Sequence, residues 1–145
     1  LHTDLATSRR RMADGKRLIE DIIGRPAAGF VAPDWLYGPD ALTALAESGF
    51  PIAEDSWSVW QPASGECLCT GPVIAWAGHS GPQLVSSLML ERLPPAMLHA
   101  VPVLRIALDP EDGWAPQRAG RDRMLERFCR RRTVARYDGL LPAGA

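Results

Sequence analysis

The feature that most constrains the fold is a strand, a helix and a second strand joined by very short connections. Residues 28–33 are apolar and end at a proline, which is typical of a buried strand. Residues 39–48 have a helical pattern, with a proline at the first position and a glycine just after the end. Residues 50–53 are expected to form the next strand. Two strands connected through a helix run parallel, so this pattern predicts a βαβ unit and a parallel sheet.

The rest of the chain continues this alternation of helices and strands. The other expected elements are helices at about 8–23, 82–92 and 117–132, strands at 73–77 and 101–108, and a loop at 61–71. In the first helix, Met12, Ile19, Ile22 and Ile23 share one face, which predicts that this face is buried. The chain has 145 residues, of which 46% are apolar and 23% are charged. The length predicts a single domain, the alternation of elements predicts an α/β fold, and the composition excludes wholesale disorder, a coiled coil and a collagen-like repeat.

Three clusters of polar and aromatic residues follow the expected strands. They are Asp34-Trp35, residues 54–57, and residues 109–112, and the first two contain tryptophan. The carboxyl ends of parallel strands meet at one edge of a sheet, so these clusters are expected to converge. Carboxylates beside indoles are typical of a carbohydrate site, because an indole stacks on the apolar face of a sugar and a carboxylate accepts hydrogen bonds from its hydroxyl groups. Each residue also has a structural alternative: core packing for tryptophan, and loop or turn hydrogen bonds for aspartate.

Three sequence motifs resemble those of the polysaccharide deacetylase family, the NodB-homology type of carbohydrate esterase. In residues 24–35 a helix ends in Gly-x-Pro, and a Gly-Phe-x-x-Pro strand leads to an aromatic residue, as in the third motif of the family. Residues 45–50 match its Leu-x-x-x-Gly-Phe return, with Asp55 and Trp57 near the fourth motif. Residues 104–112 resemble the fifth motif.

The resemblance implies a parallel-sheet (β/α) barrel of the deacetylase type, lacking its first strands, over one partial domain at 1–145. It also implies metal-dependent hydrolysis of N- or O-acetyl groups on a sugar or polysaccharide. In the family a divalent metal, commonly zinc, is held by an aspartate and two histidines and activates water. The two motifs that supply the paired aspartates and the histidines are missing from this chain, apart from His2, which resembles the end of the second. A metal is therefore expected only if those motifs precede the chain.

The resemblance assigns roles to individual residues. Asp109 stands where the family has its acid histidine, so Asp109 and Asp55 are the expected catalytic residues, and His2 is the expected metal ligand. The expected sugar-binding residues are Asp34, Trp35, Trp57 and Trp114. Because the first motifs are missing and an aspartate replaces the histidine, the alternative is a non-catalytic carbohydrate-binding module or pseudoenzyme of the same fold.

Charge and cysteine content bear on possible partners. Residues 118–136 carry eight arginines against two acids, whereas residues 26–117 carry two bases against ten acids. The arginines are expected to form a solvated helix face, and nucleic-acid binding is disfavoured because aromatic residues are not interleaved with them. The odd count of three cysteines predicts reduced thiols; a zinc site of Cys67, Cys69 and His79 would lack a fourth ligand.

Two further expectations concern location and assembly. The chain has no run of 18 apolar residues and no basic-then-apolar leader at its start. No membrane span is therefore expected, and the cytoplasm is the default location. A partial barrel exposes sheet edges, so pairing with a second copy or with a missing segment is expected.

Overall fold

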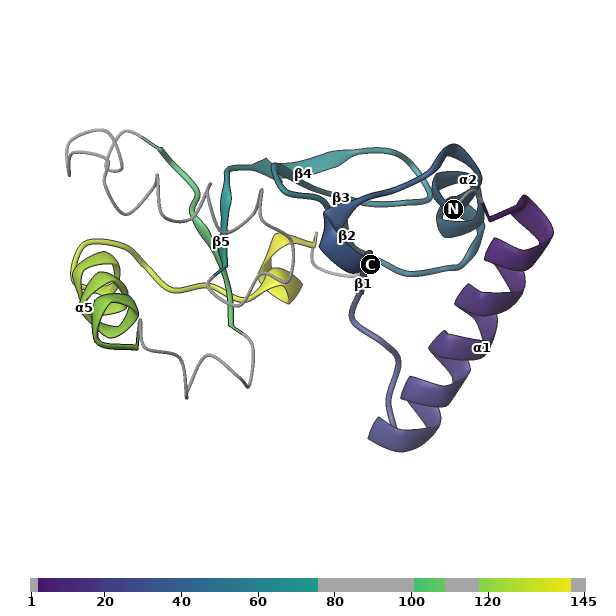
Figure 1. The fold of residues 1–145 in the computed structure, drawn as a ribbon, viewed down its shortest axis with the longest axis horizontal. Helices are drawn as coiled ribbons and strands as arrows, with labels where there is room; N and C mark the ends of the chain where they lie inside the picture. Colours follow the sequence, from purple (N-terminus) through teal and green to yellow (C-terminus); the bar gives the residue numbers. More distant parts are fainter. Residues whose placement is uncertain (1–2, 76–100, 109–117, 142–145) are drawn as a thin grey trace. The chain divides into compact units, whose positions relative to one another are not determined.

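The computed structural model describes residues 3–75, 101–108 and 118–141 (Figure 1). The chain divides into two compact units. Unit 1 comprises Leu1–Thr70 and Tyr137–Ala145, and unit 2 comprises Gly71–Arg136. Each unit has its own core and its own sheet. The expected single domain over 1–145 stays a prediction.

Unit 1 is built on a mixed four-stranded sheet in the order β1-β2-β3-β4. Its strands are β1 (Phe30–Val31), β2 (Ala53–Glu54), β3 (Ser58–Trp60) and β4 (Cys67–Thr70), and its helical segments are α1 (Leu5–Ile23), the 3-10 turn η1 (Pro33–Trp35), α2 (Pro39–Glu47) and the 3-10 turn η3 (Tyr137–Leu140). β1 and β2 are parallel, with Phe30 opposite Ala53. The predicted βαβ unit is therefore confirmed, since β1, α2 and β2 follow one another and the two strands are parallel.

The barrel prediction is wrong. After β2 the chain turns back, and both β3 and β4 pair antiparallel to their neighbours. A tight turn joins β3 to β4: Gly65 has φ 71° and its N–H donates to the carbonyl oxygen of Gln61 at 2.8 Å. A hairpin of this kind forces antiparallel pairing, so the sheet cannot continue as parallel strands. The loop expected at 61–71 is also wrong, because β4 lies within it.

The core of unit 1 lies between the two helices and the sheet. The buried residues are Ala27, Leu45, Phe50 and Ala53, with Met12, Phe30, Tyr37 and Trp60 packed against them. The helices α1 and α2 lie side by side (Figure 1) and are joined by a bidentate ion pair, in which Arg9 donates to both carboxylate oxygens of Glu47 at 2.6 and 2.8 Å. Leu45, at 1% exposure, anchors α2 in this core.

The predicted apolar face of α1 is buried only in part. Met12 packs against the core, whereas Ile19, Ile22 and Ile23, nearer the end of the helix, are 45–70% exposed. Lys16 donates to the carbonyl oxygens of Ser48 and Gly49 at 3.0 and 3.1 Å, while Glu20 accepts from the N–H of Ala27 at 2.9 Å. These polar side chains satisfy backbone groups beyond the ends of α2 and α1.

Unit 2 has a parallel pair of strands, β5 (Val73–Ala75) and β6 (Arg105–Ala107), and the helix α5 (Arg118–Cys129). Ile74 and Phe128 are its buried apolar residues. The predicted strands at 73–77 and 101–108 and the helix at 117–132 correspond to these elements, with shorter bounds in the part described. The helix expected at 82–92 lies outside the described residues.

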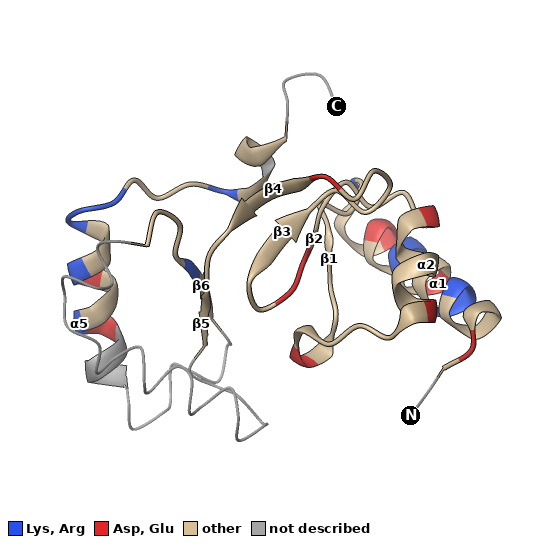
Figure 2. Ribbon diagram, turned by 90° about the horizontal axis from the view of Figure 1, so that it is seen from above, with Lys and Arg blue, Asp and Glu red and all other residues tan. Residues whose placement is uncertain are grey.

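The charges of the arginine-rich segment are largely at the surface. Figure 2 shows both basic and acidic residues along α5 and a run of basic residues after it. Arg130 pairs with Glu126 at 3.8 Å, and Arg132 donates to the carbonyl oxygens of Val101 and Pro102 at 2.8 and 3.3 Å. Arg105, in contrast, is 3% exposed, and its Nε donates to the carbonyl oxygen of Gly71 at 3.0 Å.

Within the described ranges, no helix has the length and apolar character needed to span a membrane.

Candidate functional site

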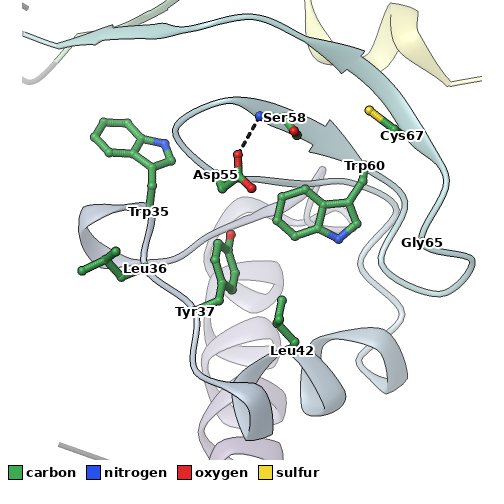
Figure 3. Close-up of a pocket in the computed structure, with 9 residues that line it drawn as sticks. All are labelled: Trp35, Leu36, Tyr37, Leu42, Asp55, Ser58, Trp60, Gly65 and Cys67. Carbon is green, nitrogen blue, oxygen red and sulfur yellow. Dashed lines mark hydrogen bonds between the residues drawn. The ribbon is translucent and has the colours of Figure 1, made fainter. Parts of the chain in front are cut away.

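A pocket of about 480 Å³ lies in unit 1, between the η1 turn, the start of α2 and the β3–β4 hairpin (Figure 3). Its lining residues are Trp35, Leu36, Tyr37, Leu42, Asp55, Ser58, Trp60, Gly65 and Cys67. The indoles of Trp35 and Trp60 lie on opposite sides of it, with Asp55 and the Tyr37 hydroxyl between them (Figure 3). The volume is in the range of small-ligand sites.

Trp35 is placed by a strained turn. Asp34 has φ 55° and Trp35 has φ 57°, so two consecutive non-glycine residues are left-handed. Each such residue costs about 1–3 kcal/mol, and such strain is concentrated at functional sites. The turn carries the chain from β1 to the pocket, and the N–H of Trp35 closes it on the carbonyl oxygen of Ala32 at 3.0 Å.

A buried carboxylate accepts a hydrogen bond from the Trp35 indole. Glu54, in β2, is 6% exposed. Its Oε1 accepts from the Trp35 indole N–H at 3.2 Å, and its Oε2 accepts from the Tyr137 hydroxyl at 2.5 Å. Tyr137 begins the η3 segment, so a residue 83 positions along the chain from Glu54 supports this side of the pocket.

Tyr37 forms the inner part of the pocket wall. Its hydroxyl donates to the carbonyl oxygen of Glu54 at 2.6 Å and accepts from the N–H of Ala32 at 3.2 Å. Its ring meets the Trp60 ring edge-on, with centroids 5.4 Å apart. Burial raises the pKa of the Tyr37 phenol above its ordinary value of 10.0. The two hydrogen bonds and the contact with Trp60 fix the Tyr37 ring in the pocket wall.

Asp55 has a structural role in the pocket. Its Oδ1 accepts from the backbone N–H groups of Trp57 and Ser58 at 2.7 and 2.6 Å, which stabilises the turn between β2 and β3. This is the loop hydrogen bonding named above as the alternative to catalysis. Both bonds end on Oδ1, so neither of them occupies Oδ2. A carboxylate oxygen is thus offered to the pocket between the two indoles.

The residues that sequence reasoning selected fall into three groups. Trp35 and Asp55 line the pocket, and Asp34 lies in the strained turn beside it. Trp57 is 58% exposed and does not line this pocket. His2, Asp109 and Trp114 lie outside the described residues, so their roles stay predictions.

The pocket also contains residues that the sequence reasoning did not select for the site. Tyr37, Ser58, Trp60 and Cys67 all contribute to the lining. A signal for two of them was present in the sequence: Val59 is β-branched and stands between Ser58 and Trp60, and alternation along a strand places these two neighbours on one face. Recognising Ser58-Val59-Trp60 as a strand would have placed both in the site.

The pocket residues do not form a metal site. In the part of the chain that the structure describes, no three histidine, cysteine or acidic side chains come together closely enough to hold a metal ion. Cys67 and Cys69 are free thiols, as expected. The zinc expected from the resemblance was assigned to His2 and to motifs missing from this chain, and it stays a prediction.

Comparison with known proteins gives no match: no family model matches the chain, no curated protein matches its sequence, and no solved structure matches its fold. The resemblance to polysaccharide deacetylases therefore stays a prediction, and the function must be argued from the pocket itself.

Proposed function

We propose that the pocket between Trp35 and Trp60 is a non-catalytic site that binds a sugar ring. The observation that carries the proposal is the pair of indoles on opposite sides of an open pocket, with a carboxylate oxygen of Asp55 between them (Figure 3). An indole face packs on the apolar C–H face of a pyranose, and a carboxylate accepts hydrogen bonds from the hydroxyl groups at its edge.

The exposed aliphatic residues and a hydroxyl group of the lining support the same conclusion. Leu36 and Leu42 are 77% and 45% exposed at the mouth of the pocket, so apolar surface is available to a ligand. The hydroxyl of Ser58 adds a polar group on the same face as Trp60. A ligand with alternating C–H and hydroxyl groups matches this lining better than a purely apolar or purely charged one.

The test is a titration of the purified chain with glucose, N-acetylglucosamine and their β-1,4-linked trimers, followed by tryptophan fluorescence. We expect saturable binding by at least one of them, weakened about tenfold in Trp35→Ala, which corresponds to about 1.4 kcal/mol. Trp57→Ala is the matched control, because Trp57 is exposed and does not line this pocket. Equal weakening by both variants, or no binding of any of these sugars, would refute the proposal.

Alkylation of the thiols locates the bound sugar. Cys67 is exposed and lines the pocket, whereas Cys129 is exposed at the end of α5 in unit 2. We expect a saturating sugar to slow iodoacetamide labelling of Cys67 and leave that of Cys129 unchanged. Labelling of Cys67 that is unaffected by a bound sugar would place the sugar elsewhere.

Deacetylation, which the resemblance implies, is the second candidate. It depends on Asp109 and His2 and is tested by acetate release from N-acetylglucosamine trimers with added zinc. Release that disappears in Asp109→Ala would make the chain an enzyme, and release unchanged in that variant would remove Asp109 from the reaction.

A further inference from the structure

We infer that Glu54 and Tyr137 are positioning residues that hold the Trp35 indole in place as a wall of the pocket. The inference rests on the proposed function of that pocket and extends it to two residues that do not line it. It is carried by one chain of contacts: the Tyr137 hydroxyl to Glu54 Oε2, and Glu54 Oε1 to the Trp35 indole N–H.

The position of Glu54 suits this role. It lies in β2, which is paired on both sides, so its backbone is fixed by the sheet. The residue is 6% exposed, and a buried carboxylate needs hydrogen-bond donors. The Trp35 indole N–H and the Tyr137 hydroxyl are two such donors, one for each oxygen. The sheet therefore places the carboxylate at a defined point, where it anchors the indole through its N–H.

Tyr137 helps to hold the Glu54 carboxylate in the orientation that reaches the indole. The Tyr137 hydroxyl donates to Oε2, and this bond restrains rotation about the last side-chain bond while Oε1 accepts from the indole N–H. The segment that begins at Tyr137 therefore contributes to the geometry of a pocket otherwise built from residues 35–67.

Trp35 needs such support because its backbone is strained. Left-handed residues other than glycine persist only where surrounding contacts determine their conformation. An indole fixed before the ligand arrives binds at a lower entropic cost than one that must be ordered by it. Loss of the anchor is therefore expected to weaken sugar binding even though Glu54 does not line the pocket.

The direct readout is the solvent exchange of the Trp35 indole proton, followed by ¹⁵N NMR without sugar and assigned by the loss of its signal in Trp35→Phe. We expect this proton to exchange at least about tenfold more slowly than that of Trp57, which is 58% exposed. Glu54→Leu is expected to abolish the difference, and Tyr137→Phe to reduce it. Glu54→Gln is expected to restore it, because its amide oxygen still accepts from the indole and its amide NH₂ donates to the Tyr137 hydroxyl.

The outcomes separate the inference from the proposed function. Slow exchange that is lost in Glu54→Leu and kept in Glu54→Gln supports positioning, whether or not any sugar binds. Exchange that is equal in the wild type, Glu54→Leu and Tyr137→Phe overturns the inference, even if sugars bind and Trp35→Ala weakens them. If Glu54→Leu does not fold, Tyr137→Phe decides alone, since it removes one hydroxyl from a residue that is 38% exposed.

If a sugar binds, its affinity for the same variants is the second readout. Affinity is expected to fall about tenfold in Glu54→Leu and to be recovered in Glu54→Gln. Affinity that is unchanged in Glu54→Leu, with the indole proton released, would overturn the expected link between the anchor and sugar binding, while the exchange result would still support positioning of the indole.

Discussion

A single methyl group added at Gly29 is expected to destabilise unit 1 through the first hydrogen bond of its parallel strand pair. A Cβ at Gly29 would lie 2.8 Å from the carbonyl oxygen of Ile52 and 3.3 Å from its Cβ. Real Cβ atoms essentially never approach within 3.0 Å, so backbone must shift. The same carbonyl oxygen accepts from the N–H of Phe30 at 2.9 Å, and the methyl group would displace the acceptor of that bond.

The expected cost of Gly29→Ala combines overpacking with a weakened backbone hydrogen bond. Overpacking of this kind costs about 1–3 kcal/mol, and a hydrogen bond contributes about 0.5–1.5 kcal/mol. The free energy of unfolding is therefore expected to fall by about 2 kcal/mol. Gly15→Ala is the matched control: it lies inside α1 with nothing within 4 Å of its Cβ, so the same methyl group is expected to stabilise the helix by about 0.5–1 kcal/mol.

The assay is urea denaturation of both variants, together with hydrogen exchange of the Phe30 amide. We expect opposite signs for the two substitutions, and faster exchange at Phe30 in Gly29→Ala alone. A Gly29→Ala variant as stable as the wild type, with Phe30 exchange unchanged, would refute the reasoning, because the close contact with Ile52 would then have no consequence.

Two further predictions concern pH. Hydrogen bonds from Arg9 hold the pKa of Glu47 below its ordinary value of 4.5, so the pair stabilises the fold above about pH 4.5 and this contribution is lost as pH falls through the lower folded pKa. Urea midpoints of the wild type and Glu47→Gln should therefore differ at neutral pH and converge in acid; a difference undiminished in acid contradicts this. Burial raises the pKa of Tyr37, so its contribution to stability is complete below about pH 10 and is lost as pH rises through the higher folded pKa. In Tyr137→Phe, phenolate absorbance should appear only above pH 10, and its appearance at that pH or below would show that the ring is not buried.

The fold could be predicted where local signals and chain connectivity agree. The parallel pair β1 and β2 follows from two short apolar segments with a proline-initiated helix between them. The β3–β4 hairpin was missed because its turn depends on the left-handed Gly65 and two backbone hydrogen bonds, in a segment rich in polar residues. Once that hairpin was read as a loop, the alternation of helices and strands favoured a parallel sheet, and the resemblance to polysaccharide deacetylases implied a barrel.

The burial of α1 could be predicted only in part from hydrophobicity. Met12 packs against the core, as predicted, whereas Lys16, one turn later on the same face, donates to backbone carbonyls after α2. Those partners exist only once α2 is in place, so no pattern within α1 indicates them. The isoleucines nearer the end of the helix are exposed.

Some residues of the candidate site could likewise be predicted from the sequence, and others could not. Trp35 and Asp55 were selected because they follow expected strands, and both line the pocket. Tyr37 lies just beyond Asp34-Trp35 and was not selected, and the partnership of Glu54 with Tyr137 joins residues 83 positions apart, a pairing that one sequence does not contain.

The division of the chain has a consequence for its covalent topology. The chain leaves unit 1 at Thr70 and re-enters it at Tyr137, so unit 2 is inserted within the sequence of unit 1. A single cut between these two points would leave the final segment covalently separate from the sheet, held to it by contacts such as the hydrogen bond from Tyr137 to Glu54. The cut protein would then stay together in native buffer and separate in denaturant. Its tendency to come apart would measure how firmly the two fragments are held together by the contacts within each unit.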